Sequence, residues 1–313
     1  MRGFVLAAGF GTRLRPLTEH IPKALVTVCG KPLLERSLSF MRNQGIEEIA
    51  VNSHYLPEML QRFRAGQNNS FELFQENGAI RGTGGALFNA KEFLGGDDLF
   101  FVLNVDILCS FDLKKVIRDF SSSSALCGLI AFPAESGRGT ILYNRTTGIY
   151  EGTPGETERG RLTADALFIG AAIYRKEFLD LLTPFDFSIV PVWKRAVAAG
   201  NEVRLFVQQS GWWKDIGTPE ALAAVHFSVL DAQSGIEAGE KLKINYAQKY
   251  CVPEMLYERF FPGPYAWVET VNVGEGCRIS RSVVLEGVEI SGGVNITDSI
   301  LTPWGDIKIH GKD

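Results

Sequence analysis

Short apolar runs alternate with segments of helical spacing over the first two thirds of the chain. The runs at residues 3–8, 49–52, 99–103, 126–132 and 167–174 have the length and composition of buried strands. Apolar residues recur every three or four positions at 32–43, 57–64, 113–120, 176–182, 190–199 and 219–230, which predicts helices. This alternation favours an α/β fold with a mixed, mainly parallel sheet.

Punctuating residues set the limits of the predicted domains. Gly200 follows one helix at the position where a C-terminal glycine is expected. Thr218 and Pro219 are predicted as the N-cap and first residue of the last helix. Beyond it, residues 231–268 show no clean period and contain three prolines, which predicts irregular chain with some helix. We therefore expect a domain at 1–230, a connecting segment at 231–270 and a third part at 271–313.

The third part has a repeating apolar pattern of its own. Branched aliphatic residues recur near every sixth position, with glycines and small residues between them. This pattern resembles the hexapeptide repeat of a left-handed β-helix, here with fewer than two coils. An unfinished solenoid leaves an open end, so we expect it to contact a neighbour or a second copy in a homo-oligomer. The alternative is a β-meander. The repeating positions are Val273, Ile279, Leu285, Ile290, Ile296 and Leu301.

Composition narrows the class of protein. Hydrophobic residues make up 45% of the 313 residues and charged residues 22%, which is ordinary for a globular chain. The formal net charge of -4 gives no basic field, so we expect neither nucleic acid nor membrane as a partner. No signal peptide or transmembrane run is visible. Five dispersed cysteines favour a reducing, cytoplasmic location, and the four histidines do not cluster with them as in a zinc site.

A glycine-containing loop, LAAGFGTRLRPLT at residues 6–18, follows the first predicted strand. Glycine lets a backbone turn sharply near a ligand, and the N–H groups of such a turn can bind phosphate oxygens. Thr12 and Arg13 add donors and charge. The loop has Leu14 where a dinucleotide fingerprint needs a third glycine, and it lacks the Gly-Lys-Ser/Thr of a P-loop. Alone, Gly9 and Gly11 could simply form a tight turn.

Together with PKAL at residues 22–25, this loop resembles the signature of the sugar-1-phosphate nucleotidyltransferase family. The resemblance implies a Rossmann-like nucleotide-diphospho-sugar transferase domain whose loop wraps the triphosphate of a nucleotide. By that match Arg13 assists the departure of pyrophosphate and Lys23 contacts phosphate. The loop residues expected to bind the nucleotide are Leu6, Ala8, Gly9, Gly11 and Thr12.

A second glycine-rich segment, GTGGAL at residues 82–87, resembles the part of the family that lines the nucleobase. The match implies that Gly82 and Thr83 contact the nucleotide and that Gln75 or Glu76 reads the base edge. The spacing between Gln75 or Glu76 and the GTGGAL segment departs by about one residue from the family's pattern. By itself the segment could also be the start of a glycine-rich helix.

Two aspartates match the family's magnesium ligands. Asp106 ends a buried run, where open α/β sheets bind ligands, and Asn104-Val105-Asp106 resembles an Asn-Gly-Asp motif. Asp215 lies in WKDIGTPE, residues 213–220, which resembles the motif that carries the second ligand. The resemblance thus implies Mg²⁺ as cofactor. The alternative for Asp106 is an aspartate that caps a turn.

The expected sugar site is less complete. Gly139, Glu151 and Gly170 match family residues that contact the sugar. Many members follow the acidic residue with a lysine that holds the sugar phosphate, whereas this chain has Gly152 there. We hypothesise that a nearby cation replaces that lysine. The candidates are Arg159, Arg161 and Lys214.

The implied activity joins a nucleoside triphosphate and a sugar-1-phosphate into an NDP-sugar and pyrophosphate. Among subgroups, the chain resembles mannose-1-phosphate guanylyltransferases, favoured by the tail, and N-acetylmuramate-1-phosphate uridylyltransferases. One alternative is a regulatory paralogue that binds nucleotide-sugars without catalysis, although such proteins usually lose loop or metal residues that are kept here. The other is a hexapeptide acyltransferase, which needs a longer solenoid and a histidine in it, whereas this tail has only His310.

Overall fold

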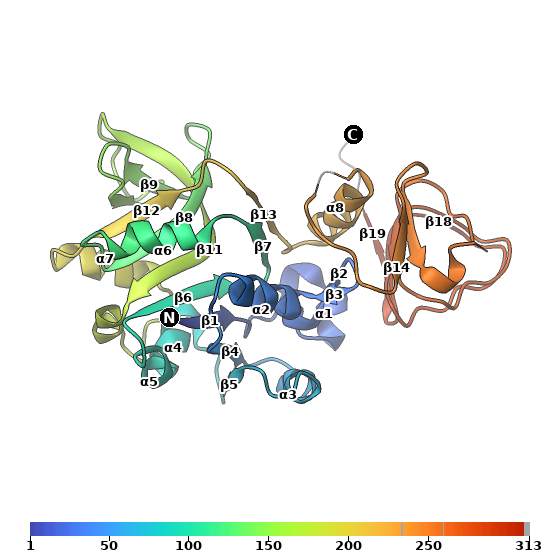
Figure 1. The fold of residues 1–313 in the computed structure, drawn as a ribbon, viewed down its shortest axis with the longest axis horizontal. Coiled ribbons are helices and arrows are strands. Elements are labelled where there is room, and N and C mark those ends of the chain that lie inside the picture. The colour runs from blue at the N-terminus through green and yellow to red at the C-terminus, as the bar shows by residue number, and fades with distance from the viewer. Residues whose placement is uncertain (233, 259, 310–313) are drawn as a thin grey trace. The chain divides into compact units, whose positions relative to one another are not determined.

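A computed structural model describes residues 1–232, 234–258 and 260–309 (Figure 1). The chain forms two compact units. The first comprises Met1–Gly9 and Ser37–Trp213, and the second comprises Phe10–Arg36 and Lys214–Asp313. The expected domain limits at residues 230 and 270 stay predictions. His310 lies outside the described residues.

The first unit is built on a mixed sheet of nine strands in the described part of the chain. Its main path runs β10-β9-β11-β6-β1-β4-β5, and β8 joins it through β11 and carries β12. A separate small sheet pairs β7 with β13, a strand whose last two residues, Lys214 and Asp215, belong to the second unit. The strands are β1 (Arg2–Leu6), β4 (Ile49–Ser53), β5 (Glu72–Gln75), β6 (Leu99–Asn104), β7 (Ile107–Ser110), β8 (Cys127–Pro133), β9 (Ile141–Asn144), β10 (Tyr150–Gly152), β11 (Thr163–Arg175), β12 (Val203–Val207) and β13 (Trp212–Asp215).

Four neighbouring strands, β6, β1, β4 and β5, are parallel to one another (Figure 1). Their carboxyl ends therefore meet at one edge of the sheet, where α/β folds bind ligands. The apolar runs form strands here because both faces are covered. Phe4, Phe100 and Leu103, for example, are fully buried. The predicted mixed sheet is confirmed.

The long strand β11 joins the parallel strands to the antiparallel part of the sheet. It pairs with β6 and β8, and its first residues pair with β9. Its pairing with β8 shifts between Phe168 and Ala171, which marks a bulge. Gly170 lies in this bulge at φ 75°, a conformation that side chains with a Cβ rarely adopt.

The helices of the first unit agree with the sequence pattern. The region predicted as helix at 176–182 is a short 3-10 helix. The GTGGAL segment forms the start of a helix, which was the alternative to a role at the nucleobase considered for it. Leu87 of that helix and Trp193 join the sheet residues in one apolar core. The elements are α3 (Pro57–Gly66), α4 (Gly82–Asn89), α5 (Lys91–Leu94), α6 (Leu113–Ser121), η3 (Lys176–Leu181) and α7 (Val190–Ala198), with α2 (Leu33–Asn43) continuing from the second unit.

The second unit combines short elements from two stretches of sequence with a six-stranded sheet. That sheet has the order β14-β15-β16-β17-β18-β19. Pro219–Leu230 forms α8, and Thr218 caps it by accepting a hydrogen bond from the N–H of Ala221, as predicted. The other elements are η1 (Thr12–Leu14), α1 (Leu17–His20), η2 (Lys23–Leu25), β2 (Thr27–Val28), β3 (Lys31–Pro32), β14 (Leu242–Asn245), β15 (Tyr250–Pro253), η4 (Glu254–Leu256), β16 (Ala266–Val268), β17 (Arg278–Val284), β18 (Asn295–Thr302) and β19 (Gly305–Lys308).

The strands of this sheet correct two expectations. Residues 231–268 were expected to be irregular with some helix, but they contain β14, β15 and β16, which are too short to show a period in the sequence. The β-meander alternative is wrong for β15 to β18, because these successive strands pair in parallel. A meander would place neighbours antiparallel.

The cysteines are free thiols, and three examples show their common environment. Burial raises the pKa of Cys109 to about 12 and raises the pKa values of Cys29 and Cys127 further. Such thiols stay protonated and make poor nucleophiles. Among the described residues, no helix has both the length and the apolar character needed to cross a membrane.

Candidate active site

The glycine loop begins in the first unit at the end of β1. Its backbone is anchored there by a buried polar side chain, because the N–H of Ala7 donates a hydrogen bond to Oδ1 of Asn52 over 2.6 Å. Asn52 lies on β4, the parallel neighbour of β1. Leu6 and Ala8 flank this anchor, and a Cβ added to Gly9 would meet no atom within 4 Å. The start of the loop is thus fixed, whereas Gly9 has open space beside it.

Asn52 also connects the loop to the second glycine-rich segment. Its Nδ2 donates to Oε1 of Glu76 over 2.8 Å, and Oε2 of Glu76 accepts from the N–H of Arg81 over 2.7 Å. Glu76 is only 2% exposed. The chain itself occupies both of its carboxylate oxygens, and its role in reading a base stays a prediction. The neighbouring Gln75 is exposed and accepts a hydrogen bond from Gln61.

Sequence reasoning did not find Asn52. The available signal was a polar residue in a strand that is otherwise buried. In the structure it takes part in two of the three hydrogen bonds that connect Ala7 to Arg81 through Asn52 and Glu76, across the carboxyl ends of β1, β4 and β5. Buried polar groups in such networks fix geometry because each lost bond leaves an unpaired donor or acceptor.

Glycines in the GTGG segment allow α4 to approach another backbone closely. A Cβ at Gly82 would lie 2.0 Å from the carbonyl oxygen of Phe187, and one at Gly84 would lie 2.4 Å from that of Asp186. Thr83 uses the same approach: its N–H donates to Phe187 over 2.8 Å, and its hydroxyl accepts from the N–H of Ile189 over 2.8 Å. These glycines therefore have a packing reason as well as the predicted role at the base.

The carboxyl end of β6 carries the Asn-Val-Asp motif. Val105 is buried and donates its N–H to the carbonyl oxygen of Leu6 over 3.1 Å, which joins the ends of β6 and β1. Asp106 follows, half-buried, in the turn before β7. Asn104 borders Gly170, since a Cβ at position 170 would lie 2.5 Å from the Asn104 Nδ2. The carboxylate lies at the edge where the sequence predicts ligand binding.

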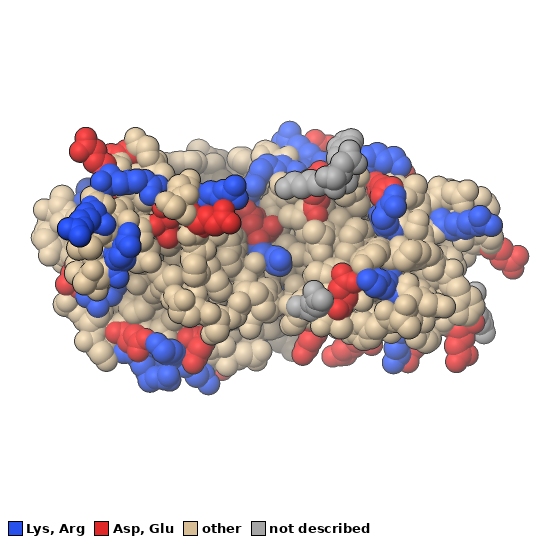
Figure 2. Space-filling model, turned by 90° about the horizontal axis from the view of Figure 1, so that it is seen from above, with Lys and Arg blue, Asp and Glu red and all other residues tan. Residues whose placement is uncertain are grey.

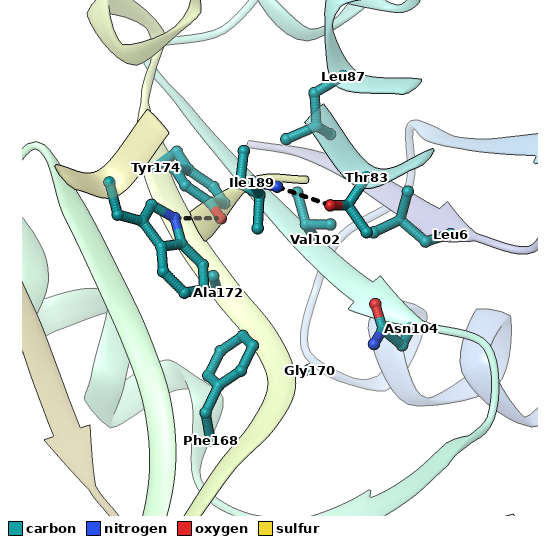
Figure 3. A pocket seen from close by; sticks show the side chains of 11 residues that line it. Leu6, Thr83, Leu87, Val102, Asn104, Phe168, Gly170, Ala172, Tyr174 and Ile189 are labelled. Carbon is teal, nitrogen blue, oxygen red and sulfur yellow. Dashed lines mark hydrogen bonds between the residues drawn. The ribbon is translucent and has the colours of Figure 1, made fainter. Parts of the chain in front are cut away.

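A small cavity of about 60 Å³ opens beside Asn104 and Thr83 (Figure 3). Each surrounding element contributes side chains from one face, spaced by two positions in strands and by four in helices. The cavity contains two of the predicted site residues, Thr83 and Gly170. Its lining consists of Leu6, Thr83, Leu87, Val102, Asn104, Phe168, Gly170, Ala172, Tyr174, Ile189 and Trp193.

Gly139 and the candidate cation Arg159 lie beside a carboxylate, Asp165, that the sequence did not reveal. Arg159 donates two hydrogen bonds to Asp165, over 2.6 and 2.7 Å, and this lowers the pKa of Asp165 to about 2. A Cβ at Gly139 would lie 2.7 Å from the Cβ of Asp165. Glu151 accepts from the hydroxyl of Thr163 over 2.6 Å. Arg159, a candidate for the missing phosphate lysine, is therefore already paired.

The remainder of the glycine loop belongs to the second unit. Gly11 has φ 63° and precedes η1, and a Cβ there would lie 2.9 Å from Thr18 Cγ2 and 3.1 Å from Lys23 Cβ. Thr18 is buried and donates its hydroxyl to the carbonyl oxygen of Gly11 over 2.8 Å. Only glycine fits this position, and the fit places Lys23 directly beside the turn.

Arg13 and Asp215 form a loose ion pair in the second unit. Nη2 of Arg13 lies 3.8 Å from Oδ2 of Asp215, and the two side chains are 61% and 43% exposed. A Cβ at Gly217 would lie 2.4 Å from Arg13 Nη2, so the glycine gives the guanidinium room. Lys214 is exposed, as is Arg161 of the first unit. Both charges of the pair can therefore still meet a ligand.

The charged side chains carry no strong field of one sign. Figure 2 shows Lys and Arg interspersed with Asp and Glu on the face that is drawn. This distribution agrees with the net charge of -4. An anionic ligand would therefore be attracted by local groups such as Arg13 and Lys23 rather than by an extended basic surface.

Comparison with known proteins relates these features to a family. A family model described as "Nucleotidyl transferase" matches residues 2–143. Mannose-1-phosphate guanyltransferase of Hypocrea jecorina is 29% identical over 70% of this chain and 62% of its own length. Mannose-1-phosphate guanylyltransferase 1 of Arabidopsis thaliana is 26% identical over 99% of this chain and 83% of its own length. The chain thus spans less than two thirds of the first relative.

A solved structure shares the fold. HddC from Yersinia pseudotuberculosis, crystallised with GMP-PN, is 26% identical with a TM-score of 0.59. The similarity covers 72% of this chain and 97% of HddC. The α/β fold, the matched N-terminal residues and the relatives all agree. The matched region, residues 2–143, belongs to the nucleotidyl transferase family, and the chain as a whole is similar to the relatives named above.

Proposed function

We propose that this chain transfers a nucleoside monophosphate from a nucleoside triphosphate to a sugar-1-phosphate and releases pyrophosphate. The observation that carries the proposal is the turn at Gly11, with Lys23 beside it and the exposed Arg13 two residues on. A glycine turn flanked by two cations suits a polyphosphate. The names of the relatives favour GTP and mannose-1-phosphate as the first pair to test.

The reaction needs charge neutralisation more than proton transfer. A phosphate oxygen of the sugar-1-phosphate attacks the α-phosphorus, and the bond from that phosphorus to the bridging oxygen breaks, so the electron pair leaves with pyrophosphate. The attacking phosphate is largely ionised near neutral pH, since its second pKa is about 6. No general base is required, and positioning and electrostatic stabilisation supply the catalysis. We assign Arg13 to the departing pyrophosphate and Lys23 to a phosphate of the nucleotide.

The remaining predicted residues keep their assignments within this proposal. The residues assigned to the nucleotide are Leu6, Ala8, Gly9, Gly11, Thr12, Gln75, Glu76, Gly82 and Thr83. Gly139, Glu151 and Gly170 are assigned to the sugar. The support is the sequence resemblance, together with the position of Leu6 and Gly170 beside Asn104 in the first unit. For Glu76 the assignment is indirect, through the backbone that it holds.

Magnesium is the cofactor that this chemistry implies, and the available donors fit it. Asp106 and Asp215 offer carboxylate oxygens, and Mg²⁺ usually takes one or two carboxylates with water and phosphate completing its octahedron. Asp215 is 43% exposed, and its nearest cation is beyond hydrogen-bond distance. When bound, magnesium neutralises phosphate charge. Over the described part of the chain, no group of three or more His, Cys, Asp or Glu side chains could hold a metal ion.

The C-terminal strands support a short left-handed β-helix. Parallel partners lie 16 or 17 residues apart, as in Ala266 with Ser282 and Ile279 with Ile296. This offset is close to the length of one coil of three hexapeptides. Ile279, Ile290 and Leu301 of the predicted repeat are buried. We infer that the coil also offers an end for self-association, which light scattering of the purified chain tests.

The experiment that tests the reaction is a pyrophosphate-release panel with magnesium. GTP, UTP, dTTP, CTP and ATP are each combined with several sugar-1-phosphates, and at least one pair should turn over. Asp106→Ala should lower kcat by about 10²–10³-fold, the cost of removing one charge contact from such a site, with an unchanged melting temperature. Silence over the whole panel with retained binding of NDP-sugars would instead support the regulatory alternative.

A further inference from the structure

The cavity of Figure 3 has a buried apolar floor and a more open, partly polar mouth. Leu87, Val102, Ala172, Tyr174, Ile189 and Trp193 form the floor, and all of them are buried. Leu6, Thr83, Asn104, Phe168 and Gly170 form the mouth, and all of them are partly exposed. The cavity is therefore a pit that a ligand can enter at the carboxyl edge of the parallel strands.

Aromatic residues of the floor and of the mouth make the pit rigid. The rings of Phe168 and Trp193 meet edge to face with centroids 5.2 Å apart. The hydroxyl of Tyr174 accepts a hydrogen bond from Trp193 Nε1 over 3.3 Å, and its ring stacks on Phe100 at 5.0 Å. Burial raises the pKa of Tyr174 well above its ordinary value, so the phenol stays neutral. The floor thus presents apolar surface without a charge.

The mouth contains two polar groups. The hydroxyl of Thr83 already accepts from the N–H of Ile189, and it keeps a proton to donate. The side-chain amide of Asn104 makes no hydrogen bond within the described part of the chain. It offers both a donor and an acceptor, and the absence of a Cβ at Gly170 leaves room for it. A complementary ligand group would itself be a small amide.

The volume limits the size of that group. The pit of about 60 Å³ is larger than the 10–15 Å³ that one water needs and much smaller than the cavity of about 150 Å³ that takes benzene. By the same ratio about two or three heavy atoms fit inside the pit, and any further polar atoms of the group lie at its mouth. A hydroxyl could pair with Asn104 but would leave the floor unfilled. A methyl could fill the floor but would leave the amide unpaired. An acetamido group satisfies both.

We propose that the pit binds the N-acetyl group of an acetamido sugar-1-phosphate. The acetyl methyl lies against Ala172 and Trp193 of the floor and the Phe168 ring of the mouth, and the amide of the sugar pairs with Asn104. This inference rests on the proposed transfer reaction, but it departs from the sugar in the relatives' names. It also gives Gly170 a specific role, since any side chain there would displace the Asn104 amide.

Matched substrate pairs test the preference. Glucose-1-phosphate is compared with N-acetylglucosamine-1-phosphate, and mannose-1-phosphate with N-acetylmannosamine-1-phosphate, each with every nucleotide. We expect kcat/KM to favour the acetylated member by about 10–100-fold, within the range that one apolar group in a pocket provides. A parent sugar phosphate used as well as or better than its acetylated partner would overturn the proposal.

Variants connect the preference to the pit. Ala172→Val narrows the floor and Asn104→Leu removes the amide at similar volume, and each should lower the acetyl preference about tenfold or more. Ala171→Val is the matched control, because Ala171 is equally buried on the same strand but does not line the pit. A preference that survives both pit variants, or that falls equally in the control, contradicts the assignment.

A binding measurement separates this proposal from the proposed reaction. Saturation-transfer difference NMR with N-acetylglucosamine-1-phosphate should show the acetyl methyl as the most saturated group, and Ala172→Val should abolish that signal. If no pair turns over but the methyl is saturated, the reaction is wrong and the pit assignment stands. If turnover occurs and the methyl receives no saturation, the pit assignment fails and the reaction stands.

Discussion

Two glutamates, one in each compact unit, are buried to a similar degree but held by different donors. Glu76 of the first unit is 2% exposed, and the side chain of Glu269 in the second unit is 4% exposed. Each accepts a hydrogen bond from a backbone N–H in a turn: Glu76 from Arg81 over 2.7 Å and Glu269 from Gly30 over 2.8 Å. Both carboxylates therefore fix local backbone.

The other hydrogen-bond partners of the two glutamates differ in one respect, which is whether donor and acceptor can exchange roles. Glu76 accepts from the Asn52 amide, whose oxygen is already committed to the N–H of Ala7, so each bond has one possible direction. Glu269 accepts from Trp267 Nε1 over 3.0 Å and from the hydroxyl of Thr27 over 3.2 Å. A hydroxyl can donate or accept. Nε2 of the buried His226 also lies 3.7 Å from Oε1 of Glu269. The hydrogen bonds of the first network therefore have fixed directions, whereas the Thr27 hydroxyl of the second can reverse its own.

The largest effect is expected for Asn52→Asp, which removes the donor between the two oxygens of the first network. Two carboxylates would then face each other at the 2.8 Å that separates Asn52 and Glu76 now. Like charges at this distance cannot both stay ionised. We expect a loss of about 3–5 kcal/mol in unfolding free energy, measured by urea titration, and a partial recovery as acid supplies a shared proton.

The double variant Asn52→Asp/Glu76→Gln checks the cause. The carboxylate introduced at position 52 would accept from both Ala7 and the new amide, and the amide oxygen introduced at position 76 would accept from Arg81. All three hydrogen bonds would then return, with one of them reversed. The unfolding free energy should return to within about 1 kcal/mol of the parent value. The KM for the nucleotide should return toward the parent value as well. A double variant as impaired as the single one would show that the network does not act as a unit.

The same substitution at both glutamates compares the two units directly. Glu76→Gln should cost about 1–3 kcal/mol, the cost of an unsatisfied buried group, and should raise the KM for the nucleotide because both glycine segments shift. Glu269→Gln should cost less than about 1 kcal/mol, since Thr27 can turn to accept. Steady-state kinetics and urea unfolding measure both. Equal costs would mean that the reversible hydroxyl is not what distinguishes the two sites.

The smallest effect concerns a third buried carboxylate, Asp165, whose donor is charged. Arg159 lowers its pKa to about 2, from an ordinary value of 3.8. Since the folded pKa is the lower one, the pair stabilises the fold above about pH 4, and this contribution is lost as the pH falls toward 2. The stability difference between the parent and Asp165→Asn should therefore shrink over this range. A constant difference in thermal unfolding from neutral pH to pH 2 would contradict the assignment.

Local patterns predicted most of the elements that carry the site. The strand before the glycine loop, the buried run before Asp106 and the cap at Thr218 all depend on residues close in sequence, and each is found where it was expected. The strands at 242–245 and 266–268 were missed because three or four residues cannot show a period. The first pairs with the equally short strand at 250–253, and the second pairs with residues 282–284.

The polar network and the pit were also invisible in the sequence, for a different reason. Glu76 was expected only as a residue that reads the base, and Asn52 is a single polar residue in a buried strand. The parallel pairing of β4 with β5 makes them neighbours. Phe168 lies on the predicted strand 167–174, and Trp193 on the predicted helix 190–199. Their shared cavity depends on how α7 lies along β11 within the first unit. Contacts between elements distant in sequence decide these features, and a single sequence does not specify them.

The bulge in β11 has a consequence for insertions and deletions. Phe168 pairs with Ala131 and Ala171 pairs with Ile130, so β11 contains two extra residues, Ile169 and Gly170, opposite a single step of β8. Two residues equal one full period of the pleat, and the strand therefore presents the same faces before and after the bulge. Loss of one residue here would move every side chain on one side of the bulge to the opposite face of the sheet. Length changes at this point should therefore be tolerated only in pairs.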